Sequence, residues 1–193
     1  MTGEKPKRVF LAIELPEDVK NQIIAVQDKL KILLKGIRWT RPEGIHLTLK
    51  FFGDIYEKEI VPISEIITEN TKSAETISLN GGEIGVFPNL GRPRVLWLGL
   101  NGDIERLSIL QEAIDIDLEV YGYKKERRKF SPHLTLGRVK SFRGGIMNLS
   151  QVIKRGGDYR AGQFSSKGLT LFQSDLKPGG AVYTKLAYFP FGG

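Results

Sequence analysis

The feature that most constrains this chain is a tetrapeptide that occurs twice. His-Leu-Thr-Leu stands at 46–49 and at 133–136, and His46 and His133 are the only histidines of the sequence. Both copies lie in strand-like runs, IHLTLKFFG and PHLTLGRVK. Side chains alternate between the faces of a strand, so each copy presents an imidazole and a hydroxyl on one face and two leucines on the other. We expect both strands to be anchored in a core by their leucines.

The two motifs belong to a longer internal repeat. The histidines are 133 − 46 = 87 positions apart, and a shift of 87 also places ISLNGGEIGVF on FSSKGLTLFQS. A shift of 86 places RVFLAIEL, from Arg8, on RVLWLGLN, from Arg94. This near-constant offset predicts two copies of a strand–helix–strand–helix–strand unit, at about 8–90 and 94–190. We expect an α+β fold with two pseudo-symmetric lobes, each an antiparallel sheet with flanking helices, and an active-site cleft between them.

No polar linker separates the copies, so 1–193 is predicted to be a single bilobal domain whose residues 1–7 are disordered. Helices are expected at about 16–35, 60–72, 104–120 and 149–154. Strands are expected at about 8–15, 45–52, 77–87, 95–100, 133–139, 162–173 and 181–189.

Composition bounds the class of protein. The 193 residues are 40% hydrophobic and 26% charged, which is typical of a globular protein with a sizeable core. The chain has no apolar run of membrane-spanning length, no signal-peptide pattern at its start and no cysteine for a disulfide or a thiolate metal site. We therefore predict a cytoplasmic protein without a membrane partner. The net charge of +7 (29 − 22) favours polyanionic partners, although many basic proteins bind no nucleic acid.

The repeated motif predicts acid–base chemistry. One histidine in a strand is most often a core residue with satisfied hydrogen bonds, but that role does not require an imidazole in both copies. Because histidine titrates near neutral pH, one ring can accept a proton from water while the other donates to a departing oxygen. Thr48 and Thr135 share a face with His46 and His133 and can hydrogen-bond the oxygens of a phosphoryl group. A metal site is not expected, since there is no third histidine and no carboxylate beside either motif.

The two motifs and their flanks resemble the two-histidine phosphoesterase superfamily, whose signature is HxTx. Within it the chain is similar to the LigT/ThpR branch of RNA 2′,3′-cyclic phosphodiesterases, historically called 2′-5′ RNA ligases. The likeness runs from Arg8 to Phe191 and is carried by RVFLAIELP, HLTLKFFGD, FPNLGRPRVLWLGL, FSPHLTLGR and LFQSDLKPGGAVYTKL.

This resemblance implies a metal-independent enzyme that needs no cofactor and opens RNA 2′,3′-cyclic phosphate ends, or cyclic nucleotides, to 2′-phosphomonoesters. His46 would then be the proton donor to the leaving 3′ oxygen, and His133 the proton acceptor that activates water. The pseudo-symmetry leaves room for these two roles to be exchanged. The reverse reaction would join a cyclic phosphate to a 5′-hydroxyl in a 2′-5′ linkage. We expect a monomer.

Two basic residues beside the motifs are further candidates for phosphate binding. Lys50 shares the face of His46 if the strand is regular, where it could hold phosphate or cover the rim of the cleft. Arg138 resembles a family arginine that contacts substrate phosphate, but it needs a β-bulge, for example at Gly137, to face the same way as His133. The basic run 124–130 is either a solvated loop or a lip that catches RNA.

Alternatives remain. The same site could act on ADP-ribose cyclic phosphate or on an RNA 3′ tail, or the fold could be a non-catalytic RNA- or nucleotide-binding module. Pure binding would not require both imidazoles. The paired glycines of GGEIG and RGGD lack the spacing of a dinucleotide or P-loop motif, so no ATP or nicotinamide cofactor is expected.

Overall fold

The computed structural model describes residues 5–125, 129–140, 146–155, 159–178 and 180–192. They form the helices α1 (Glu17–Leu33), α2 (Glu57–Thr71), α3 (Ile104–Glu119) and α4 (Ile146–Lys154), with a 3-10 turn η1 (Pro42–Gly44). The strands are β1 (Lys7–Glu14), β2 (Ile37–Trp39), β3 (His46–Ile55), β4 (Ile77–Phe87), β5 (Val95–Gly102), β6 (His133–Val139), β7 (Gln163–Ser166), β8 (Gly168–Lys177) and β9 (Gly180–Pro190).

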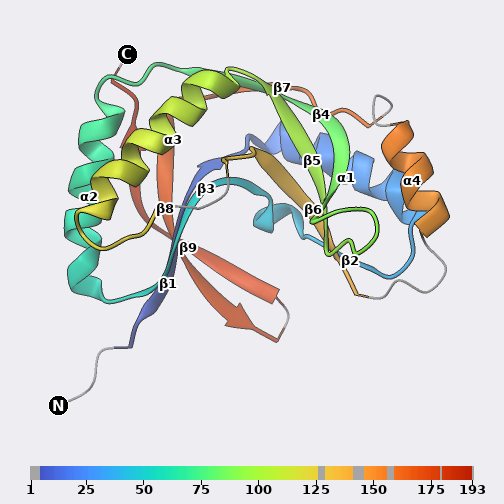
Figure 1. The fold of residues 1–193 in the computed structure, drawn as a ribbon, viewed down its shortest axis with the longest axis horizontal. Coiled ribbons are helices and arrows are strands. Elements are labelled where there is room, and N and C mark those ends of the chain that lie inside the picture. The colour runs from blue at the N-terminus through green and yellow to red at the C-terminus, as the bar shows by residue number, and fades with distance from the viewer. Residues whose placement is uncertain (1–4, 126–128, 141–145, 156–158, 179, 193) are drawn as a thin grey trace.

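The strands form two antiparallel sheets that lie next to each other (Figure 1). Sheet A has the order β3-β1-β8-β9, and sheet B has the order β2-β6-β5-β4-β7. Each half of the chain gives two strands to the sheet of the other half. Sheet A contains β8 and β9 from the second half, with β8 paired to β1, and sheet B contains β2 and β4 from the first half, with β4 paired to β5. The α+β class with two pseudo-symmetric halves is as predicted. The exchange of strands supports one bilobal domain over 1–193, which stays a prediction.

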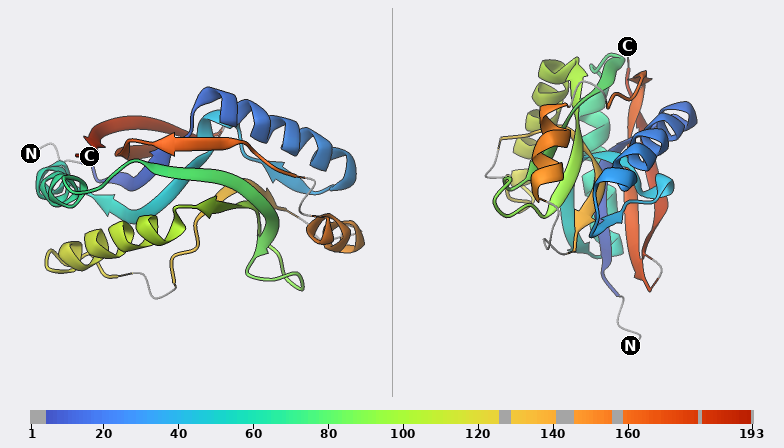
Figure 2. Two further views of the ribbon diagram at one scale, coloured as in Figure 1. Left: turned by 90° about the horizontal axis from the view of Figure 1, so that it is seen from above. Right: turned by 90° about the vertical axis from the view of Figure 1, so that its right-hand side faces the viewer.

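The helices are exchanged in the same way. α1 follows a strand of sheet A but covers sheet B together with α4, whereas α3 follows a strand of sheet B but covers sheet A together with α2 (Figures 1 and 2). Two buried contacts fix this arrangement. From α1, the Gln27 amide donates a hydrogen bond to the backbone oxygen of Leu136 at 2.8 Å. From α3, Asp115 accepts a hydrogen bond from Lys50 of β3 at 2.5 Å.

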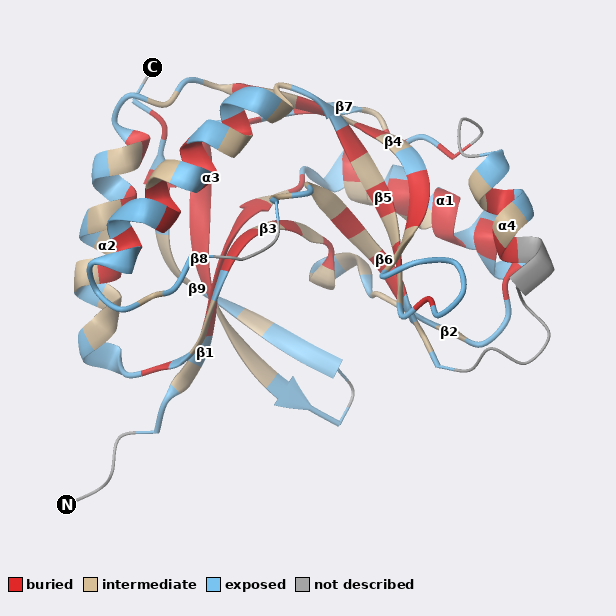
Figure 3. Cartoon of the chain, in the orientation of Figure 1, coloured by how far each residue is buried: buried red, intermediate tan, exposed pale blue. Residues whose placement is uncertain are grey.

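The motif leucines lie in the core, as expected from strand alternation. Leu47, Leu134 and Leu136 are fully buried, and Leu49 is nearly so. Figure 3 shows the buried residues concentrated between each sheet and its two helices. The apolar stripe predicted for α1 is buried as far as Leu30, but Leu33 is 43% exposed, since the helix ends there.

The strand register corrects one offset of the repeat. Ile13 pairs with Leu47 in sheet A, and the corresponding residue of the second motif, Leu134, pairs with Leu98 in sheet B. The first strands of the two halves are therefore 98 − 13 = 85 positions apart rather than 86. A shift of 86 would place Ile13 on Gly99, and a slip of one residue moves every side chain of a strand to the opposite face.

Some element boundaries differ from the predicted ones. α2 begins at Glu57, earlier than expected, because the Glu59 carboxylate accepts a hydrogen bond from the Tyr56 amide and caps the helix. β2 and η1 were not predicted, and the strand expected at 162–173 is divided between the two sheets as β7 and β8. Of the tip predicted to be disordered, 1–4 lie outside the described residues, and Lys7 already belongs to β1.

Candidate active site

The two motif strands lie next to each other although they belong to different sheets. Cα atoms of β3 and β6 approach within 8 Å. His46 is the first residue of β3, and His133 is the first residue of β6. The structure thus places both motifs where sheet A meets sheet B.

The first motif strand is irregular at the last leucine of its motif. In β3, Thr48 pairs with Ala12 of β1. Leu11, the residue before Ala12 in β1, pairs with Lys50, so Leu49 has no partner. An unpaired residue of this kind is a β-bulge, and it reverses the alternation of every side chain that follows.

This bulge moves Lys50 away from the site, and its predicted place on the His46 face is wrong. Lys50 is 3% exposed and forms a buried ion pair with Asp115 of α3, at 2.5 Å between Nζ and Oδ1. It also donates to the backbone oxygen of Lys124 at 3.1 Å. Lys50 therefore joins β3 to the helix layer and offers no ammonium group to a substrate.

The second motif strand has a bulge at the equivalent position. Thr135 pairs with Trp97, and Gly137 pairs with the preceding residue, Leu96, so Leu136 is the unpaired residue. Arg138 consequently returns to the face of Thr135, and it is exposed. The bulge that Arg138 needs is present, one residue earlier than the suggested Gly137.

Aromatic rings enclose His46. Its ring stacks on Phe10 at a centroid distance of 4.6 Å, and Tyr183 of β9 meets it edge-on at 5.2 Å and 90°. Phe172 of β8 lies at 6.4 Å. Burial lowers the pKa of His46 to about 4, against a hydrogen bond to the backbone of Gly44 that raises it. His46 is therefore neutral at neutral pH in the free protein.

His133 has a similar but smaller enclosure. Phe87 meets its ring edge-on at 4.9 Å, and the Trp97 indole lies at 6.4 Å. Its Nδ1 lies 2.7 Å from the backbone oxygen of Ser131. Burial lowers the pKa of His133, and the hydrogen bond to Ser131 opposes that shift. Each histidine is thus hydrogen-bonded to the backbone two residues before it, which orients the ring and leaves its other nitrogen available for proton transfer.

Gly85 makes room for the indole beside His133. A Cβ on Gly85 would lie 2.1 Å from the Trp97 ring, so only glycine permits this packing. Trp97 Nε1 is buried and has no hydrogen-bond partner among the described residues. An unpaired buried donor costs about 1–3 kcal/mol, and the ring is nevertheless kept against His133.

The sequence prediction did not include Phe10, Phe172 or Tyr183 among the site residues. Strand alternation could have found Phe10, which lies on the same face of β1 as Ala12, the partner of Thr48. Tyr183 gave no such signal, because its proximity to His46 depends on the order of strands in sheet A.

Two further expectations concern a metal site and the basic run 124–130. Among the described residues, no group of three or more His, Cys, Asp or Glu side chains could hold a metal ion. The basic run 124–130 contains 126–128, which lie outside the described residues.

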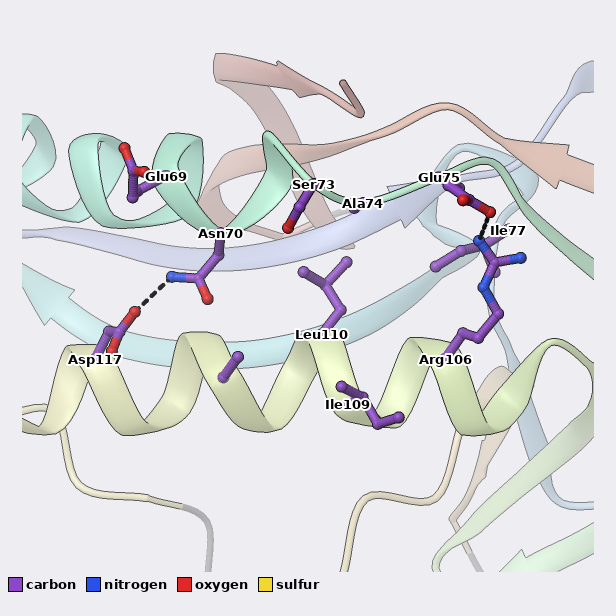
Figure 4. A pocket seen from close by; sticks show the side chains of 11 residues that line it. Glu69, Asn70, Ser73, Ala74, Glu75, Ile77, Arg106, Ile109, Leu110 and Asp117 are labelled. Carbon is purple, nitrogen blue, oxygen red and sulfur yellow. Dashed lines mark hydrogen bonds and ion pairs between the residues drawn. The ribbon is translucent and has the colours of Figure 1, made fainter. Parts of the chain in front are cut away.

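A pocket of about 470 Å³ lies elsewhere, between α2 and α3 (Figure 4). Arg106 pairs with Glu75 across it at 2.7 Å, and Asn70 donates to Asp117 at 2.7 Å. It contains neither histidine nor threonine of the motifs. Both helices cover the Lys50 side of sheet A, so this pocket is separate from the motif histidines. In the part of the chain that the structure describes, no helix is both long and apolar enough for a membrane span.

Comparison with known families gives one match that covers most of the chain. The family model described as LigT like Phosphoesterase matches residues 13–97 and again 98–183, so its two matches correspond to the two halves of the repeat.

Curated relatives named RNA 2′,3′-cyclic phosphodiesterase match nearly the whole chain. The protein from Methanothermobacter thermautotrophicus is 34% identical over 94% of this chain and 97% of its own length. The protein from Methanocaldococcus jannaschii is 36% identical over 91% of this chain and 96% of its own length.

Solved structures share the fold. A crystal structure of a protein from Thermus thermophilus has a TM-score of 0.79 at 26% identity and covers 96% of this chain and 98% of its own. Escherichia coli LigT in complex with 3′-AMP has a TM-score of 0.77 at 25% identity, with coverage of 96% and 98%.

Proposed function

This chain belongs to the LigT-like phosphoesterase family, and on that premise we propose that it is an enzyme that hydrolyses RNA 2′,3′-cyclic phosphate ends. The observation that carries the proposal is the pair of adjacent motif strands, which present one histidine and one threonine each from two different sheets. The curated relatives named RNA 2′,3′-cyclic phosphodiesterase support the substrate class.

His46 and His133 carry the reaction in this proposal. His133 accepts a proton from water, whose oxygen attacks the phosphorus of the cyclic phosphate. The bond from phosphorus to the 3′ oxygen breaks, and His46 donates a proton to that oxygen. The product is a 2′-phosphomonoester with a free 3′-hydroxyl, and one water molecule is consumed. The reverse reaction, with a 5′-hydroxyl in place of water, would form a 2′-5′ linkage.

The low pKa of His46 sets a condition on this assignment. A proton donor must be charged before it reacts, whereas burial keeps the ring neutral in the free protein. The negative phosphate of the substrate raises the pKa of a nearby imidazole, so substrate binding supplies the proton-donating form. An enclosed imidazole is thereby charged only when an anion is present.

The remaining motif residues bind the phosphate. Thr48 and Thr135 are partly exposed and can donate their hydroxyl hydrogens to non-bridging oxygens. The bulge at Leu136 brings the Arg138 guanidinium to the same face as Thr135, where it can pair with negative charge that builds up on the phosphoryl group.

A direct experiment incubates the purified protein with a 2′,3′-cyclic nucleotide in EDTA and identifies the product isomer. We expect a 2′-phosphate and a bell-shaped dependence of kcat/KM on pH, as an acid and a base require. Absence of turnover on cyclic nucleotides and on RNA with a cyclic end would contradict the proposal. A panel that includes ADP-ribose cyclic phosphate and RNA with an unmodified 3′ tail separates the alternative substrates.

Location and oligomeric state are predictions of the sequence. We propose a monomer, since both motif strands of the proposed site belong to one chain and the site needs no second copy. We also propose a cytoplasmic location, as the sequence predicts. Light scattering of the purified protein measures its mass directly, and a dimer would contradict this part of the proposal.

A further inference from the structure

Tyr183 lies beside the proposed site and has no role in the proposed mechanism. Its ring packs edge-on against both His46 and Phe10, each at 5.2 Å between centroids. It lies on β9, at the far edge of sheet A from β3 in the strand order. Its side chain is partly buried, and its hydroxyl has no hydrogen-bond partner among the described residues. The phenol therefore has an unused donor close to the proposed proton-donating imidazole.

Two arginines from different sheets lie on the side of this phenol. Val9 of β1 pairs with Gln173 of β8, and the next residue of β8, Ser174, pairs with Tyr183, so Arg8 and Tyr183 lie at the same level of sheet A with β8 between them. Burial raises the pKa of Tyr183, and the positive charges of Arg138 and Arg8 lower it, in that order of size. Arg8 lies on β1, on the same face as Phe10 by alternation, and Arg138 lies on β6, on the same face as Thr135. Both charges thus come from the sheet faces that carry the motif hydroxyls and histidines.

Neither arginine has an acidic partner among the residues that the structure describes. Within the described part of the chain, Arg8 and Arg138 form no ion pair at 4.0 Å or less, and both are exposed. Lys185, two residues from Tyr183, is by contrast paired with Glu14 at 2.5 Å. Two unpaired like charges near one neutral group raise the electrostatic energy of the free protein, and a bound anion lowers it.

We propose that Arg8, Tyr183 and Arg138 form a phosphate-binding subsite that is built from both sheets beside His46. The guanidinium groups supply charge and several N–H donors, and the phenol supplies one O–H donor, which together suit the oxygens of a phosphate. The subsite rests on the proposed function for its physiological ligand, but its affinity for phosphate does not depend on turnover. Arg138 faces the scissile phosphate in the proposed function, so Arg8 and Tyr183 contact either that phosphate or the next phosphate of the RNA chain.

The test measures the binding of inorganic phosphate by calorimetry and its inhibition of cyclic nucleotide turnover. The variants are Arg8→Gln, which removes the charge, and Tyr183→Phe, which keeps the ring against His46 and removes only the hydroxyl. We expect Arg8→Gln to weaken phosphate binding about tenfold or more and Tyr183→Phe about threefold to tenfold, as for one charged and one neutral hydrogen bond. Arg155→Gln is the matched control, since exposed Arg155 follows α4, which packs on the helix side of sheet B.

The outcomes separate the subsite from the proposed function. Unchanged phosphate affinity in both variants, with unfolding temperatures equal to that of the wild type, would overturn the subsite even if the wild type turns over its substrate. Weaker phosphate binding in a protein without turnover would support the subsite and contradict the proposed function.

A further comparison identifies the phosphate. Turnover is measured with a 2′,3′-cyclic mononucleotide lacking a 5′-phosphate and with a dinucleotide ending in a cyclic phosphate. An equal rise in KM for both substrates assigns the subsite to the scissile phosphate, and a rise for the dinucleotide alone assigns it to the neighbouring one. No rise in KM for either substrate counts against the subsite.

Discussion

The strands β3 and β6 carry the same tetrapeptide and the same bulge, yet the basic residue that follows the motif is buried in β3 and exposed in β6. The bulges at Leu49 and Leu136 turn the residue after the motif toward the helix layer and the next residue back toward the histidine. In β3 the basic residue comes first, as Lys50, and is buried against Asp115. In β6 it comes second, as Arg138, and is exposed. The position of the basic residue, first or second after the motif, thus decides whether it is a structural cation or a candidate phosphate ligand.

The largest expected effect tests what the two strands have in common. His46→Ala and His133→Ala should each reduce kcat about a thousandfold or more, because each removes one proton-transfer group. Groups that act as a unit are not additive, so the double variant should be little worse than the poorer single variant. Steady-state turnover of a cyclic nucleotide measures this, with circular dichroism to confirm folding. Full activity in either folded variant would refute the two-histidine mechanism.

The second prediction tests how the strands differ. Lys50→Ala should lower the free energy of unfolding by about 3–5 kcal/mol, because it leaves the Asp115 carboxylate buried without its cation. Arg138→Ala should change it by less than about 0.5 kcal/mol, since that side chain is exposed.

Urea unfolding of both variants measures the two free energies. The double replacement Lys50→Met with Asp115→Leu should recover most of the loss, since apolar residues of similar volume can replace a buried pair. Equal destabilisation by Lys50→Ala and Arg138→Ala would show that the bulges do not separate their roles.

The third prediction concerns pH and the enclosure of His46. Its pKa is lowered from 6.5 to about 4 in the folded protein, so the unfolded chain binds the proton more tightly. Above pH 6.5 the ring is neutral in both the folded and the unfolded state, so it costs no stability. As the pH falls from 6.5 toward 4 the unfolded chain takes up the proton first, and the free energy of unfolding falls by up to about 3 kcal/mol. Urea unfolding at about pH 7 and at about pH 4.5 measures the loss, which should be smaller in His46→Gln. The same loss in both proteins would show that His46 is not the cause.

The smallest expected effect tests the residue that β6 has in place of Lys50. A Cβ on Gly137 would lie 2.6 Å from Ile37 Cγ2 and 3.0 Å from the backbone oxygen of Arg38. Gly137→Ala should therefore destabilise the protein by about 1–3 kcal/mol, because β2 has to shift. Gly91→Ala, whose Cβ would meet only the Asn89 side chain at 3.4 Å, is the control. Equal unfolding midpoints for the two variants would contradict the close approach of β2.

Sequence reasoning succeeded where the information is local. The second motif strand and the helix at 104–120 lie within a residue or two of their predicted positions, since periods of 2 and 3.6 are visible within one segment. The shared face of His46 and Thr48 also follows from local alternation, because the bulge comes after both residues. Lys50 was misplaced because a β-bulge can be recognised only from the pairing with the partner strand. No residue type in either motif indicates a bulge.

The sequence by itself determined that this chain has two matching strands, each with a histidine and a threonine on one face and leucines in the core. Only the tertiary structure decided that the halves exchange strands and helices, and that Tyr183 of β9 packs against His46 of β3. It also decided that His46 is enclosed by aromatic rings and has a low pKa. The physical reason is that side-chain alternation acts between neighbouring residues, whereas register, burial and electrostatic environment depend on residues far apart in the chain.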